Sequence, residues 1–360
     1  MADYSDEIEG VEKEIRETPY HKATEHHIGK LRARLAKLKD KQLDSQVKSK
    51  GGGGEGFAIK KQGDATVVLV GPPSSGKSTL INLLTNAESK VASYAFTTVS
   101  VIPGMLLYKD AYIQILDVPG LIEGASKGKG RGKEVISVVR GADLILIMTD
   151  VEREGLIDNL VRELHESGVR INEDGPAVTI TKKTEGGINI QTNIKQDLST
   201  LTIKEMAREF GITNADIVIK EKLTFDRIID AFSANRIYLP ALFVVNKIDH
   251  SAQQSPKELE GNLLRISAQK GVGIETLKEA IWSALGLIRV FLVRPDEEPS
   301  LNHSIIMKTG DTLSDVAKKL GSDFSESKRL AKIWGPAAHF PGQEVPLATH
   351  VLENLQVRFI

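Results

Sequence analysis

The sequence predicts an α/β protein whose main domain is a doubly wound, mostly parallel sheet. Two observations lead to this fold class. Four apolar segments of strand length each end in a short polar motif, as parallel strands do at the ligand-binding edge of such a sheet; they lie at 65–70, 112–116, 241–245 and 263–266. The chain between the second and third segments is about 70 residues longer than two strand–helix steps require. That surplus predicts an α+β insert inside the main domain.

The composition is that of an ordinary soluble protein. The 360 residues are 41% hydrophobic and 26% charged, which suits about two to four domains. A formal net charge of −1 gives no general reason to expect nucleic acid, so any basic surface must be local. The absence of cysteine removes disulfides and cysteine metal sites and fits a cytoplasmic location. The acidic N-terminus and the lack of a long apolar run predict neither a signal peptide nor a membrane span.

Residues 1–50 predict a helical hairpin. Apolar residues recur at helical spacing on both sides of Thr18-Pro19, which interrupts the pattern. Residues 1–25 carry eight acids and three bases, whereas residues 30–50 carry eight bases and two acids. In one interpretation the two antiparallel helices simply attract each other. In the other, which is compatible with the first, the basic helix also contacts RNA phosphates.

The segment GPPSSGKST has the spacing of a phosphate-binding loop between a strand and a helix. Its glycines let the backbone fold around a phosphate, and the helix N-terminus adds partial positive charge. Lys77 would place a full charge at the outer phosphates, and the Ser78 hydroxyl would ligate Mg²⁺. We expect the whole loop to contact nucleotide: Gly71, Pro72, Pro73, Ser74, Ser75, Gly76, Lys77, Ser78 and Thr79.

Three further motifs would complete a site for GTP and GDP. DVPG places Asp117 where it can reach a phosphate-bound Mg²⁺ through water, and Gly120 where its N–H can reach a terminal phosphate. In NKID, the Asp249 carboxylate can accept hydrogen bonds from guanine N1–H and the 2-amino group, neither of which adenine offers. The backbone of SAQ can contact guanine O6. The expected base-binding residues are Asn246, Lys247, Asp249, Ser267, Ala268 and Gln269.

The loop YAFTTV should respond to the state of the nucleotide. A threonine there can complete the Mg²⁺ shell when a γ-phosphate is present, and the contact is lost on hydrolysis. We favour Thr98, with Thr97 as its competitor. The expected metal ligands are therefore Ser78, Thr98 and Asp117.

The catalytic group is unknown from the sequence. Leu121 follows DVPG at the position where Ras-like enzymes carry a glutamine that orients the attacking water, so unassisted hydrolysis should be slow. Glu123 is a candidate for orienting the water instead, but nothing in the sequence indicates that its side chain points toward the water. Some GTPases use K⁺ instead of an arginine finger, but their phosphate loop usually has asparagine where this chain has Ser74. A role for K⁺ therefore stays open.

The insert, at 171–240, should contain both strands and helices. Segments 177–181 and 187–192 alternate apolar and polar residues, which predicts a β-hairpin. Thr202 with Glu205 predicts a capping box at the start of the helix that follows. A further strand and an amphipathic helix complete the pattern.

The C-terminal region, at 288–360, should form a β-grasp. Two strand patterns, at 288–293 and 304–308, precede an amphipathic helix in GDTLSDVAKKLG, and an alternating strand ends the chain at 355–360. We therefore expect a helical hairpin at 1–50, the main domain at 57–170 and 241–287, the insert at 171–240 and the β-grasp at 288–360.

The chain resembles the developmentally regulated GTP-binding (DRG) family, which is Obg-related and belongs to the translation-factor class of P-loop GTPases. The resemblance rests on GGGGEGFAIKKQGDATVVLVGPPSSGKSTLIN, YAFTTV, DVPGLIEGASKGKGRG and NKID, and it extends over nearly the whole chain. It implies that the insert is similar to a domain of a small-subunit ribosomal protein and that the β-grasp is a TGS domain. It also implies RNA or ribosome contact and, as for eukaryotic members, a dedicated stabilising protein partner.

These observations predict a Mg²⁺-dependent GTP-binding switch that hydrolyses GTP slowly and acts in translation, with neither membrane nor DNA among its partners. Two other classes compete with this reading. A metabolic ATPase or kinase would share the phosphate loop, but Asp249 argues against it. A nucleotide-binding adaptor, whose end domains bind RNA or protein regardless of nucleotide state, would be distinguished by partner binding that ignores GTP and GDP.

Overall fold

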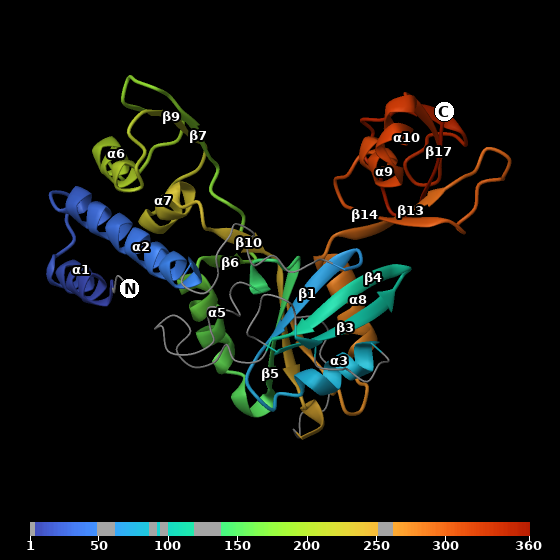
Figure 1. Cartoon of the computed structure of the whole chain (residues 1–360), viewed down its shortest axis with the longest axis horizontal. Coiled ribbons are helices and arrows are strands. Elements are labelled where there is room, and N and C mark those ends of the chain that lie inside the picture. The colour runs from blue at the N-terminus through green and yellow to red at the C-terminus, as the bar shows by residue number, and fades with distance from the viewer. Residues whose placement is uncertain (1–3, 49–61, 86–91, 94–99, 119–137, 251–261) are drawn as a thin grey trace. The chain divides into compact units, whose positions relative to one another are not determined.

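The computed structural model describes residues 4–48, 62–85, 92–93, 100–118, 138–250 and 262–360 (Figure 1). It divides into two units. The first comprises Met1–Gly56 and Gly168–Tyr238, and the second comprises Phe57–Ser167 and Leu239–Ile360. No helix in the part of the chain that the structure describes is long and apolar enough to cross a membrane.

The second unit is built on a mostly parallel sheet with the strand order β12-β11-β5-β1-β4-β3-β2. Strand β1 pairs in parallel with both β4 and β5, and β11 pairs in parallel with β5 and β12, whereas β3 runs antiparallel to β4. The strands are β1 (Ala65–Val70), β2 (Ala92–Ser93), β3 (Ser100–Tyr108), β4 (Ala111–Asp117), β5 (Leu144–Asp150), β11 (Ala241–Asn246) and β12 (Leu263–Arg265).

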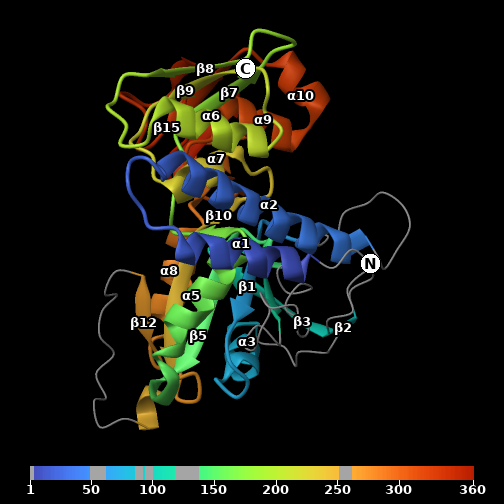
Figure 2. The same ribbon diagram turned by 90° about the vertical axis from the view of Figure 1, so that its left-hand side faces the viewer.

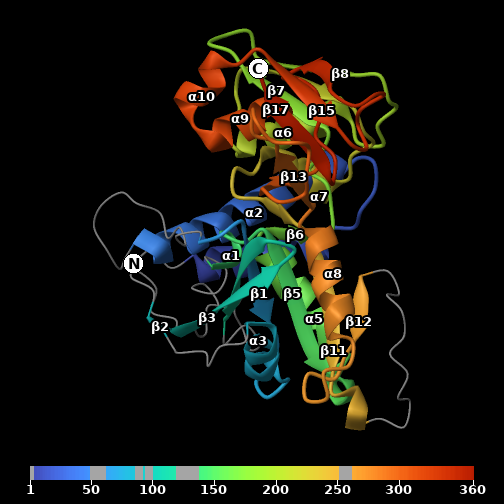
Figure 3. The same ribbon diagram turned by 90° about the vertical axis from the view of Figure 1, so that its right-hand side faces the viewer.

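Helices cover this sheet, as the predicted doubly wound fold requires. Helices α3 (Lys77–Thr85) and α8 (Ile274–Ala284) share one apolar core with the strands, and α8 runs beside β11 (Figure 3). Helix α5 (Leu156–Glu166) packs on β5 (Figure 2), and its buried leucines lie outside that core. Strand β1 is buried along its whole length, which fits its sequence, apolar at every position except Thr66.

The C-terminal part of this unit forms the predicted β-grasp-like arrangement. Its sheet has the order β14-β13-β17-β15-β16, with β13 parallel to β17 and the other pairs antiparallel. A capping box between Thr312 and Asp315 begins helix α9, and Gly321 ends it. The elements are β13 (Leu287–Leu292), β14 (Ser304–Lys308), α9 (Leu313–Leu320), α10 (Ser322–Ser327), β15 (Leu330–Trp334), β16 (Gln343–Pro346) and β17 (Leu355–Phe359).

The first unit joins the two N-terminal helices to the insert. Helix α1 (Ser5–Glu17) lies along α2 (Glu25–Lys48), as Figure 2 shows, so the predicted helical pair is confirmed. The opposite side of α2 packs on α6 (Thr200–Glu209) and α7 (Phe225–Phe232). A sheet of the order β7-β9-β8 backs these helices, and β6 pairs with β10; these strands are β6 (Val169–Ile171), β7 (Val178–Lys182), β8 (Ile188–Thr192), β9 (Ala215–Ile219) and β10 (Ile237–Leu239).

The predicted hairpin in the insert is wrong, although both of its strands are present. Strand β9 lies between β7 and β8, antiparallel to the first and parallel to the second. Alternating polarity identifies a half-buried strand but not its neighbour. The later segment Ala215–Ile219 has a burial pattern of alternate buried residues, more regular than either predicted strand. This regular burial accompanies its central position in the sheet.

The predicted capping box at Thr202 is also wrong. Helix α6 begins one turn earlier, because Ser199 is its N-cap and accepts a hydrogen bond from the Thr202 N–H. The Thr202 hydroxyl instead donates to Glu25 of α2 at 2.9 Å. Glu25 also accepts the Ser199 N–H at 2.8 Å. Its pKa falls to about 2 because the hydrogen bonds from Lys22, Ser199 and Thr202 outweigh the opposing effect of burial.

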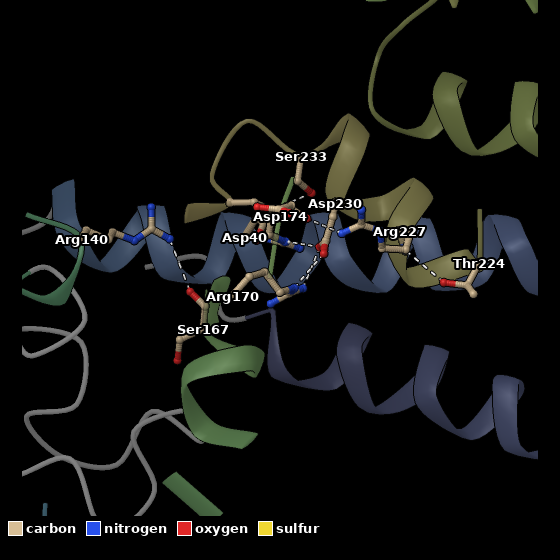
Figure 4. Close-up of polar contacts among 10 residues, drawn as sticks. Asp40, Arg140, Ser167, Arg170, Asp174, Thr224, Arg227, Asp230 and Ser233 are labelled. Carbon is tan, nitrogen blue, oxygen red and sulfur yellow. Dashed lines mark hydrogen bonds and ion pairs between the residues drawn. The ribbon is translucent and has the colours of Figure 1, made fainter. Parts of the chain in front are cut away.

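A network of buried charges ties the C-terminal half of α2 to the insert (Figure 4). Asp230 on α7 accepts two hydrogen bonds from Arg170, both at 2.7 Å, and one from Arg236 at 2.9 Å. Arg236 in turn donates to Asp40 of α2 at 3.0 Å. The side chains of Arg170 and Asp230 are 5% and 3% exposed. Such a pair is stable only while every charge keeps its partner.

Gly29 lets α2 approach the insert, and its replacement should destabilise the first unit. A Cβ there would lie 2.8 Å from Thr202 Cγ2 and 3.0 Å from the Phe225 ring. We expect Gly29→Ala to lower the free energy of unfolding by about 1–2 kcal/mol, since overpacking outweighs the gain in helix propensity. Gly10 in α1 has no atom within 4 Å of its Cβ position, so Gly10→Ala should stabilise instead. Urea unfolding of both variants tests this, and equal stabilisation by both would contradict it.

Candidate functional site

The segment Gly71–Thr79 comprises the loop after the buried strand β1 and the first three residues of α3, and it has two positions that only glycine fits. A Cβ on Gly71 would collide with the backbone carbonyl oxygen of Met148 on β5. Gly76 has a φ of 96°, and a Cβ there would collide with the side-chain amide of Asn246. The loop therefore lies close against β5 and against the end of β11.

Lys77 is buried at the start of α3 and points back into its own loop. Its Nζ donates to the carbonyl oxygens of Gly71 at 3.0 Å and of Pro72 at 2.8 Å. Burial lowers the pKa of the ammonium group, which the negative charge of Asp117 partly opposes. The charge is thus held against the backbone of the loop that the sequence predicts to bind the phosphates.

Ser78 and Asp117 meet at the carboxyl end of β4. The Ser78 hydroxyl donates to Asp117 Oδ2 at 3.4 Å, while the buried Oδ1 has no hydrogen-bond partner among the described residues. Burial raises the pKa of Asp117, although Lys77 opposes that shift. A hydroxyl beside a buried carboxylate with a free oxygen fits a hard divalent cation such as Mg²⁺.

The segments NKID and SAQ come together at the ends of β11 and β12. The Asn246 amide donates to the Ser75 carbonyl oxygen at 2.9 Å, and its oxygen accepts the Ala268 N–H at 2.9 Å. Asp249 accepts a 2.6 Å hydrogen bond from Ser267, which lowers the pKa of the carboxylate. One asparagine thereby links the phosphate loop to both base-binding segments.

A cavity of about 620 Å³ opens between these segments. It is lined by Gly76, Thr79, Asp150, Val151, Glu152, Asn246, Lys247, Asp249, His250, Ala268 and Gln269. Five of these lie among the predicted contact residues of the phosphate loop and NKID, and two more in SAQ. A volume of several hundred cubic ångströms is of the size that small-molecule and cofactor sites have.

Three lining residues at the end of β5, together with His250 after NKID, were not predicted from the sequence. Asp150 ends that strand, and Val151 and Glu152 begin the turn η1 (Val151–Arg153). The signal was available, because Leu144–Asp150 is another apolar strand whose carboxyl end reaches the same edge of the sheet. The predicted residues Thr97, Thr98 and Gly120, together with Leu121 and Glu123, lie outside the described residues.

The fold and this loop arrangement define a P-loop GTPase domain, and comparison with known proteins agrees. A family model described as 50S ribosome-binding GTPase matches residues 66–183, and one described as the C-terminal region of the MMR_HSR1 domain matches residues 185–287. The chain is 45% identical to an uncharacterised GTP-binding protein of Methanocaldococcus jannaschii, covering 97% of this chain and 90% of that protein.

Several relatives carry a family name. The developmentally-regulated GTP-binding protein 2 homologue of Dictyostelium discoideum is 39% identical, and human developmentally-regulated GTP-binding protein 2 is 36% identical. Each alignment covers 98% of this chain and 97% of the relative. The chain therefore belongs to the developmentally regulated GTP-binding protein family.

Proposed function

We propose that this protein is a GTP-binding switch that hydrolyses GTP to GDP and phosphate slowly and acts on the ribosome or in translation in the cytoplasm. The observation that carries the nucleotide part is the Asn246 link between the phosphate loop and the base-binding segments, beside the cavity. In this proposal Gly71–Thr79 hold the phosphates, and Asn246, Lys247 and Asp249 read guanine with help from Ser267, Ala268 and Gln269. Family membership supports it.

Ser78 and Asp117 would hold Mg²⁺, with Thr98 as the nucleotide-dependent ligand. When bound, the ion neutralises charge on the outer phosphates. Ser78 would bind it directly and Asp117 through water, which gives the free Oδ1 a partner. Lys77 contributes a second positive charge once its Nζ turns from its own loop toward the phosphates.

Ser78→Ala should weaken GTP binding in the presence of Mg²⁺ far more than binding without metal. The variant removes the metal ligand but none of the backbone donors of the loop. Ser78→Thr keeps a hydroxyl at the same position and is the matched control, which should retain most of the Mg²⁺ effect. A titration of Mg²⁺ at fixed nucleotide measures the difference, and identical curves for Ser78→Ala and the native protein would contradict the metal role.

Unassisted turnover should be slow, in the range of about 10⁻⁴ to 10⁻³ s⁻¹ that is typical of intrinsic Ras activity. Leu121 cannot orient water, and no other side chain is assigned that role. Phosphate release from purified protein measures the rate, with Na⁺ and K⁺ buffers compared because a K⁺ role stays open. A rate of many turnovers per second without K⁺ or partner would refute the proposal.

Ribosome action is supported by family membership and by the description of the matching GTPase model. The test is co-sedimentation of the full chain with ribosomes in GDP and in a non-hydrolysable GTP analogue. Binding that depends on the nucleotide supports a switch. Binding that is equal in both states would indicate an adaptor, and no binding in either state would redirect the search to a protein partner.

The full chain is the right material for that experiment. Leu287 and Ile306, from the first two strands of the C-terminal sheet, belong to the same apolar core as β1, α3 and α8. A truncation near Leu287 would remove Ile306 from that core and disturb the GTPase domain. We propose that the C-terminal sheet, as a TGS domain, contributes RNA or protein binding, so surface substitutions are preferable to deletion.

A further inference from the structure

Asp150 is a buried carboxylate between the phosphate loop and the NKID segment. It ends β5 directly beside Asn246 of β11 in the sheet register. Its side chain is 5% exposed, and Oδ2 accepts a hydrogen bond from Lys247 Nζ at 3.2 Å. A charge buried to this extent is stable only with close cationic partners.

Arg153 is the second cationic partner of Asp150. The turn η1 brings it back over the end of β5, where Nε donates to Oδ1 at 3.2 Å and Nη2 donates to Oδ2 at 2.6 Å. This paired geometry is the strongest that arginine forms with a carboxylate. The hydrogen bonds from Arg153, with a smaller contribution from Lys247, lower the pKa of Asp150 to about 2.

The remaining nitrogen of Arg153 reaches the phosphate loop. Its Nη1 donates to the carbonyl oxygen of Pro73 at 3.1 Å. A continuous chain of polar contacts therefore runs from Lys247 through Asp150 and Arg153 to Pro73. This chain is separate from the Asn246–Ser75 hydrogen bond and ends at a different residue of the loop.

We propose that Asp150 and Arg153 are positioning residues that fix the phosphate loop relative to the base-binding segment and so determine how long a nucleotide stays bound. The inference rests on the proposed function and deepens it. A guanine nucleotide must contact both segments at once. If the distance between the two segments is fixed, its phosphates and its base can bind without any further ordering of the protein. The two residues act through Pro73 and Lys247, so breaking the chain lets the segments separate and accelerates dissociation.

The test is the rate at which fluorescent GDP leaves the full-length protein when chased with excess GDP. Arg153→Ala and Asp150→Asn should each accelerate release about tenfold, the effect of losing a charge-assisted hydrogen bond. The double variant should release GDP no faster than the faster single variant, because both substitutions break the same chain. Arg153 is partly exposed, with 34% of its side chain accessible. Arg153→Ala should therefore fold and allow the release rate to be measured even if Asp150→Asn does not fold.

Glu154→Gln is the matched control. Glu154 follows Arg153 in the sequence but takes no part in the chain of contacts. The substitution breaks its ion pair with Arg265, whose Nη2 lies 2.7 Å from Glu154 Oε1. Release from this variant should stay within about twofold of the native rate, as for a partly exposed pair.

The outcomes separate the two proposals. Native protein that binds no GDP would overturn the proposed function, and this inference with it. Native binding with unchanged release from folded Arg153→Ala would overturn this inference alone. Equal acceleration by Glu154→Gln, or single effects that multiply in the double variant, would overturn it too, because either result indicates independent contributions to stability.

Discussion

Asp249→Asn should weaken GTP binding by at least about tenfold and make xanthosine triphosphate the preferred nucleotide. The carboxylate would accept hydrogen bonds from guanine N1–H and the 2-amino group, and an amide can do so only in part. The 2-oxo group of xanthine accepts where guanine donates, so it matches the new amide. The Ser267 hydroxyl holds the Asp249 carboxylate in place at 2.6 Å, so the side chain is already oriented at the cavity. Competition between the two triphosphates for labelled GDP measures the change.

Ser267→Ala serves as the control for that experiment. It removes the hydrogen bond that orients Asp249 but leaves the carboxylate, so affinity should fall without a change of base preference. If Asp249→Asn kept native affinity and native preference, the assignment of NKID as the guanine-reading motif would be wrong.

Asp230→Ala should lower the free energy of unfolding of the first unit by about 3–5 kcal/mol, because it leaves the Arg170 and Arg236 charges buried without their shared partner. Three of the hydrogen bonds drawn in Figure 4 end on this carboxylate. The expected loss is large compared with the stability of a typical domain. Urea unfolding followed by circular dichroism measures it.

The comparison for Asp230→Ala is Asp216→Ala, which breaks the ion pair with Lys183 at 2.8 Å. Both partners of that pair are about one third exposed, so its loss should have little effect. A similar small effect for Asp230→Ala would show that water reaches the two arginines and that the network is not a buried one.

Four strands of the main sheet and most of the candidate site could be predicted because both depend on local sequence. Each site motif follows an apolar strand, and the carboxyl ends of parallel strands converge at one edge. The phosphate loop and NKID therefore lie side by side. Ser75 and Asn246, which form a hydrogen bond, are 171 residues apart in the sequence. Whether Asp249 reads guanine stays a prediction.

What could not be predicted depends on partners far away in the chain. Nothing in the sequence near Thr202 indicates that its hydroxyl donates to Glu25, 177 residues earlier. The local sequence therefore predicted a capping box. The position of β9 between β7 and β8 likewise follows from burial in the folded unit, not from the turn sequence. The ion pair of Arg170 with Asp230 spans 60 residues and has no sequence signal.

The first unit is assembled from the N-terminal helices and from an insert within the GTPase domain, which has a consequence for its biosynthesis. Asp40 and Arg236, which bond in the finished protein, are 196 residues apart. At about 5–20 residues per second, a ribosome needs roughly 10–40 s to add that length of chain. During this interval the N-terminal helices have emerged, but the surface on which Gly29 and Asp40 pack has not been made. The first segment synthesised therefore cannot reach its final packing until Arg236 has been added, and a nascent chain arrested before Phe232 should remain sensitive to proteolysis in α2.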